Sequence, residues 1–70
     1  MTTDEARRDL PDVNVAMPDG KIYPGHVTGR CNSFPSISVH NYHGAPWLTF
    51  SASWQQVARV AASGTPISFA

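Results

Sequence analysis

FPSISVHNYHGAPWLTFSASWQQVARVAASG, residues 34–64, decides the fold that this sequence predicts. Residues 34–40 predict a strand, because Ile37 and Val39 alternate with Ser36, Ser38 and His40, a period of two that is typical of a strand with one buried face. A turn-rich connection follows, and residues 47–50 predict a second, shorter strand. The period then lengthens to that of a helix. The stretch therefore predicts two strands that lead into one helix.

The helix prediction rests on a cap, an apolar stripe and a stop. Ser53 and Gln56 have the spacing of a capping box. The apolar residues that follow share one helical face, and they are Trp54, Val57, Ala58, Val60 and Ala61. Gly64 then favours termination. We expect a helix over about 53–62 that lies as a lid on the sheet.

The N-terminal half predicts a hairpin. Residues 13–17 alternate again, and Pro18-Asp19-Gly20 has the composition of a tight turn before a return strand over about 21–28. Residues 67–69 are compatible with a short terminal strand at a sheet edge or with a hydrophobic end that lies over the core. The sequence therefore predicts the α+β class, with one C-terminal helix on a small antiparallel sheet of three to four strands, at about 13–17, 21–28, 34–40 and 47–50.

The chain is expected to form a single domain. Its 70 residues provide material for only one hydrophobic core. Residues 1–11 are polar and charged, and Pro11 would end any short helix among them. We therefore expect a mobile polar tail over 1–11 and one β-rich domain over 12–70.

Cysteine usage and hydropathy predict the compartment. A single cysteine, Cys31, cannot form an internal disulfide, which favours a reducing environment. The first nine residues lack the apolar run of a signal peptide, and no stretch has the length and hydropathy of a membrane span. We expect a cytoplasmic protein without a membrane segment.

Charge bears on nucleic-acid binding. Five Lys and Arg residues balance five Asp and Glu residues, so the net charge gives no strong attraction to phosphate. After Asp19 the chain carries Lys21, Arg30 and Arg59 and no acidic residue. An exposed sheet face can nevertheless enter a DNA groove. The alternative hypothesis is a DNA-binding sheet face built from Thr28, Arg30, Ser36, Ser38 and His40.

Metal binding and catalysis find little support. Cys31, His26, His40 and His43 have the side chains of a zinc site, but only His40 and His43 form a close pair, so we predict no metal and keep a zinc-stabilised module as a further alternative. A Cys or Ser nucleophile would need a base and a carboxylate that orients it, and no Asp or Glu residue follows Asp19 in the sequence. No glycine-rich phosphate loop is present. We therefore expect no enzyme activity and no cofactor.

The connection over residues 41–46 is the predicted recognition surface. It is long for a hairpin loop and carries polar aromatic residues. Together with the tryptophan that follows, these side chains resemble a protein-binding hot spot. The predicted partner-binding residues are Asn41, Tyr42, His43 and Trp47, and we expect a protein partner or a second copy of the chain.

Residues 45–64 resemble a family of small actinobacterial domains of unknown function, the three-ninety-seven type. The residues that carry the resemblance are Ala45-Pro46-Trp47-Leu48-Thr49-Phe50-Ser51, followed by Trp54, Val57 and Gly64. Such proteins are often encoded beside helix-turn-helix regulators. The resemblance implies a small regulatory module that binds a transcription regulator, and it brings no catalytic residue with it.

Overall fold

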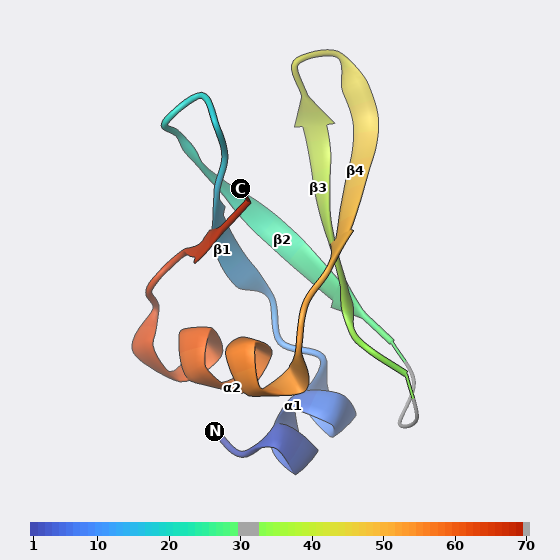
Figure 1. Cartoon of the computed structure of the whole chain (residues 1–70), viewed down its shortest axis with the longest axis vertical. Coiled ribbons are helices and arrows are strands. Elements are labelled where there is room, and N and C mark those ends of the chain that lie inside the picture. The colour runs from blue at the N-terminus through green and yellow to red at the C-terminus, as the bar shows by residue number, and fades with distance from the viewer. Residues whose placement is uncertain (30–32, 70) are drawn as a thin grey trace.

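The computed structural model describes residues 1–29 and 33–69 (Figure 1). Within them, two helices and five strands follow in the order α1 (Thr3–Asp9), β1 (Val13–Ala16), β2 (Ile22–Thr28), β3 (Ser36–Tyr42), β4 (Ala45–Ser51), α2 (Trp54–Ser63) and β5 (Ile67–Ser68). No helix among the described residues is long and apolar enough to span a membrane.

The strands form one sheet in the order β4-β3-β2-β1-β5. The pairs β1–β2, β2–β3 and β3–β4 are antiparallel, whereas β5 lies parallel to β1. The α+β class is confirmed, but the prediction of an antiparallel sheet with three to four strands is only partly right. The predicted terminal strand joins the sheet as a fifth, parallel strand, because the long segment from β2 to α2 returns the chain to β1.

Helix α2 forms as the capping pattern predicts. The Ser53 hydroxyl accepts a hydrogen bond from the Gln56 amide at 3.1 Å, and the Gln56 side chain accepts one from the Ser53 amide at 3.1 Å. Gly64 ends the helix with a left-handed φ of 75°, and its amide donates to the Val60 carbonyl. The cap and the stop therefore fix both ends of this helix.

A second helix, α1, lies within the segment that the sequence assigned to a polar tail. Thr2 and Glu5 form a capping box, and the small Ala6 is completely buried where α1 packs against α2. One buried alanine gives no apolar period, so the sequence pattern could not reveal this contact. The expectation of one helix is therefore corrected to two.

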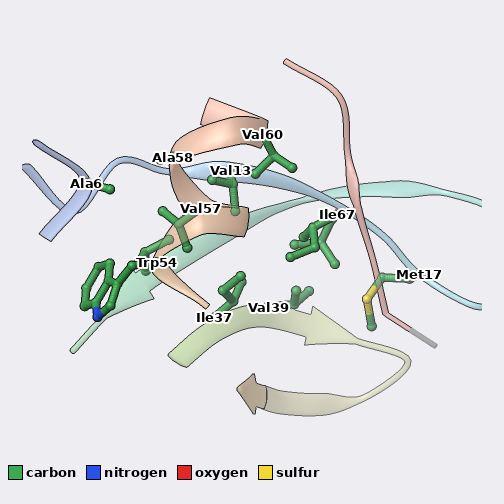
Figure 2. Packing of buried hydrophobic residues seen from close by; sticks show 12 residues of the cluster. Ala6, Val13, Met17, Ile37, Val39, Trp54, Val57, Ala58, Val60 and Ile67 are labelled. Carbon is green, nitrogen blue, oxygen red and sulfur yellow. The ribbon is translucent and has the colours of Figure 1, made fainter. Parts of the chain in front are cut away.

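The core lies between the sheet and the helices. Figure 2 shows Ile37 and Val39 of β3 pointing to the side of the sheet on which Val57 of α2 and Ile67 lie, and Ile37, Val39 and Val57 are fully buried. The other buried apolar residues are Ala6, Val13, Val15, Met17, Val27, Trp54, Ala58, Val60 and Ile67. We call the side of the sheet that faces this core the covered face and the opposite side the open face.

The connection between β3 and β4 differs from its prediction. The strands extend to Tyr42 and from Ala45, and these two residues pair directly. His43 and Gly44 alone form the turn, with φ angles of 47° and 84° that are typical of a type I′ hairpin. The prediction of a long loop over residues 41–46 is therefore wrong, because histidine also tolerates the left-handed conformation.

The sheet is strongly curved. β4 and β5 are its two edges, which would lie about 19 Å apart in a flat sheet of five strands. Yet the ring of Phe69, just after β5, packs edge-on against the ring of Phe50 in β4, with centroids 4.6 Å apart. The C-terminal residues thus reach across the covered face, which leaves the open face as the uncovered side of the molecule.

Candidate functional site

The open face of strands β2, β3 and β4 gathers exposed aromatic and polar side chains. Alternate residues point to it, as the burial patterns of the three strands show. They are Ile22, Pro24, His26 and Thr28 from β2, Ser36, Ser38 and His40 from β3, and Trp47, Thr49 and Ser51 from β4. None of these side chains carries a fixed charge.

Trp47 is the centre of this surface. Its side chain is 54% exposed, although it lies within a strand. His40, its cross-strand partner, packs against the indole with ring centroids 4.6 Å apart. His26 belongs to β2, two strands away, and its ring lies edge-on at 5.9 Å from the indole. The indole therefore leans across β3 and forms an aromatic platform with the two imidazoles, which we call the Trp47 platform.

Hydroxyl groups border the Trp47 platform. The hydroxyls of Ser38 and Thr49 are hydrogen bonded at 3.0 Å, and both residues lie on the open face beside the platform. Thr28 and Ser36 form the next cross-strand pair toward the other end of the sheet. An exposed aromatic centre with a rim of uncharged hydrogen-bonding groups is the usual composition of a protein-binding patch.

The four predicted partner-binding residues do not form one patch. Trp47 lies on the open face, whereas Tyr42 packs against the core and against the ring of Tyr23, with centroids 5.4 Å apart. Asn41 directly precedes Tyr42 and has a left-handed φ of 60°, which interrupts the alternation of side chains between the two faces along β3. His43 occupies the hairpin turn. The structure therefore separates Trp47 from the other three residues.

The predicted DNA-binding residues are brought together more closely. Thr28, Ser36, Ser38 and His40 all lie on the open face. Arg30, the only predicted phosphate-binding cation of this set, lies outside the described residues.

The zinc alternative would use Cys31, His26, His40 and His43, and the three histidines, which the structure describes, do not converge. His26 lies 3.4 Å from a carboxylate oxygen of Asp12, whereas His43 lies at the hairpin turn beside Asp19. Cys31 lies outside the described residues. Elsewhere in residues 1–29 and 33–69, no three His, Cys, Asp or Glu side chains are placed to hold a metal ion.

A cluster around Asp19 ties two hairpin turns together, and sequence reasoning missed it. The Asp19 carboxylate accepts hydrogen bonds from the Tyr23 hydroxyl at 2.6 Å and from the Lys21 amide at 2.9 Å, and His43 Nε2 lies 3.0 Å away. The Asp19 side chain is only 15% exposed. The strand order could have revealed this cluster. Alternate turns of a strand meander lie at the same end of the sheet, and the turns that carry Asp19 and His43 are two such turns.

These contacts set the ionisation of the Asp19 cluster. The Tyr23 hydroxyl, helped by the Lys21 amide and by His43, lowers the pKa of Asp19 to about 2. The same hydrogen bond raises the pKa of Tyr23 to about 12. At neutral pH the carboxylate is therefore ionised and the phenol protonated. This arrangement stabilises the turns, and it keeps Asp19 engaged as an acceptor rather than available as a base.

A groove also lies between α2 and the C-terminal residues. It has a volume of about 400 Å³ and is lined by Gln56, Arg59, Val60, Ser63, Thr65, Pro66, Ile67 and Ser68. Neither histidine nor carboxylate is among these lining residues, so the groove offers its serines no general base. Its chemistry supports no catalytic step.

Comparisons of this chain with family models, with curated proteins and with solved structures found no match.

Proposed function

We propose that this protein is a small non-enzymatic binding module whose open face recognises a protein partner. The observation that carries the proposal is the Trp47 platform: a tryptophan that is 54% exposed although it lies within a strand, flanked by two imidazoles. Tryptophan is enriched among residues that dominate binding energy, because a rigid aromatic surface loses little entropy when it is buried. The neutral rim of serine and threonine adds hydrogen bonds without a desolvated charge.

The resemblance of residues 45–64 to the three-ninety-seven type of small domain suggests what the partner is. A transcription regulator of the helix-turn-helix class is our first candidate, and the cytoplasm is the matching compartment. The strand that carries Trp47 is part of that resemblance.

Affinity capture with variants tests the proposal. The wild-type chain, Trp47→Ala and Arg59→Ala are immobilised and exposed to native extract, and the captured proteins are compared by quantitative mass spectrometry. Arg59 is exposed on α2, away from the open face, and is the matched control. We expect a specific protein that wild type and Arg59→Ala retain and that Trp47→Ala loses by at least about tenfold. Equal capture by all three chains, or capture of no specific protein, would overturn the proposal.

DNA binding by the same face is the second candidate, because Thr28, Ser36, Ser38 and His40 share it. Among the described residues this face has no lysine or arginine, and phosphate affinity depends on such cations. Titration with labelled DNA at low and physiological salt separates the two hypotheses. Binding that falls steeply with salt and is abolished by Arg30→Ala would favour DNA over protein.

A further inference from the structure

Strand β4 is an unprotected edge of the sheet. In the described part of the chain, this seven-residue strand pairs only with β3 on one side. The opposite edge, β5, is two residues long. A free edge presents backbone N–H and C=O groups that another strand can pair with. Of the two edges, only β4 is long enough to offer several such groups in a row.

The register identifies which groups point outward. The Ala52 amide donates to the Pro35 carbonyl at 3.0 Å, so this pair is hydrogen bonded across β3 and β4. Hydrogen-bonded pairs recur every second residue in an antiparallel ladder. The pairs Ile37–Phe50 and Val39–Leu48 therefore use their backbone groups within the sheet. The N–H and C=O groups of Trp47, Thr49 and Ser51 consequently point away from β3.

The composition of β4 leaves this edge open. Natural edge strands are usually protected by charged residues, above all lysine, or by proline at an outward amide. The strand Ala45–Ser51 has no charged residue, and its one proline, Pro46, precedes the outward positions. A copy of the same strand therefore meets no charge repulsion.

We infer that β4 pairs antiparallel with β4 of a second copy of this chain, around a twofold axis at Thr49. In this register Thr49 lies opposite its own copy, and Trp47 lies opposite Ser51 of the other copy. The outward groups then form about six backbone hydrogen bonds. On the covered face the half-buried Leu48 lies opposite the half-buried Phe50. Each position from residue 47 to residue 51 therefore meets a compatible residue, as an isologous interface requires.

This pairing extends the open face across both copies. The two sheets become one continuous sheet, and the Trp47 platform of each copy lies beside the hydroxyl rim of the other. The pairing does not depend on the proposed partner binding, because it uses backbone groups of the edge rather than the exposed indole surface.

Sedimentation equilibrium over a dilution series from ~1 mM to ~1 µM tests the inference. We expect a reversible monomer–dimer equilibrium for the wild-type chain. Thr49→Lys places two like charges opposite each other at the twofold axis, so its dissociation constant should rise by at least about tenfold. Thr28→Lys puts the same charge on the same face but on the central strand β2, and it should dimerise like wild type.

A second variant tests the hydrogen bonds themselves. Thr49→Pro removes an amide that points outward, so the fold should persist, as checked by circular dichroism, while the dimer is lost. A wild-type chain that stays monomeric throughout the series would overturn the inference. Equal dimerisation of wild type and Thr49→Lys, or loss of the dimer in Thr28→Lys as well, would also overturn it.

Discussion

The two faces of one sheet use the same strands for different purposes, and the two tryptophans make the contrast clearest. Trp54 is 7% exposed on the covered side, and its indole N–H donates to the Ser33 carbonyl at 2.8 Å. Trp47 is 54% exposed, and the two imidazole rings that pack against it, those of His26 and His40, are themselves exposed. The first indole completes the core, whereas the second lies where the core does not need it. The covered face therefore holds the core, and we propose that recognition belongs to the opposite, open face.

Truncation of each tryptophan is the strongest way to break this comparison. Trp54→Ala should lower the free energy of unfolding by about 3–5 kcal/mol, because it leaves a cavity and removes the hydrogen bond from the indole N–H to the Ser33 carbonyl. Trp47→Ala should lower the free energy of unfolding by about 1 kcal/mol or less, which is the stabilisation that a cross-strand pair of side chains contributes. Urea denaturation followed by circular dichroism measures both. A larger loss for Trp47→Ala than for Trp54→Ala would reverse the assignment of the faces.

Neighbouring residues of β2 sharpen the contrast within one strand. A methyl group at Gly25 on the covered face would lie 2.6 Å from Val15 Cγ2 and 2.8 Å from Ile37 Cγ2, so Gly25→Ala should cost about 1–3 kcal/mol through overpacking. His26→Ala, the next residue on the open face, should change stability by no more than about 0.5 kcal/mol. The thermal midpoints of the two variants decide the matter, and equal midpoints would show that the faces are packed alike.

At Asn41 the side chains of β3 stop alternating regularly between the open face and the covered face. Its φ of 60° directs Tyr42 to the core side, and a β-branched residue adopts this conformation with strain. Asn41→Val should therefore be about 1–2 kcal/mol less stable than Asn41→Gly, which tolerates the same φ. If valine were the more stable of the two in thermal unfolding, the left-handed conformation would be absent in solution.

The Asp19 cluster predicts the smallest effect and a defined pH dependence. The pKa of Asp19 in the fold, about 2, lies below its ordinary value of about 3.9, so its contribution is complete above that value and is lost as the pH falls toward 2. Asp19→Asn should lower the melting temperature at pH 7, and the difference from wild type should shrink as the pH falls from about 4 through 2. The variant His43→Ala keeps the Tyr23 hydrogen bond and should retain most of the pH dependence. A difference that stays constant from pH 7 to pH 2 would contradict this assignment.

At alkaline pH, Tyr23 of the same cluster predicts a loss of stability as the pH rises. The pKa of Tyr23 is raised to about 12 from about 10, so its contribution is present below pH 10 and is lost as the pH rises through 12. Spectrophotometric titration of the tyrosines should show that Asp19→Asn lowers the pKa of Tyr23 toward its ordinary value.

The sequence predicted those strands and helices whose residue pattern lies within the element itself. The alternation in β3 and the capping box at Ser53 depend on residues within one element, and both strand and helix were found where expected. Helix α1 was missed because its tertiary contact rests on the single buried Ala6. The hairpin turn at His43 was missed because His-Gly is not among the usual type I′ pairs.

Prediction of the candidate site requires the pairing register of the strands, which the pattern of residues within one strand does not give. The exposed tryptophan and the neighbouring His40 could be expected from the sequence, since they flank one turn. The contact between His26 and Trp47 spans two strands and follows only once both strand pairings are known. The same holds for Asp19 and His43, which are 24 residues apart in the chain.

The most direct test of the open face uses the two indole N–H signals in a ¹H–¹⁵N spectrum. The partner found by affinity capture is added to labelled chain at a fixed concentration of the chain. We predict that the Trp47 indole signal shifts or broadens while that of Trp54, hydrogen bonded to Ser33, is unchanged. A perturbed Trp54 signal with an unchanged Trp47 signal would contradict the assignment of recognition to the open face.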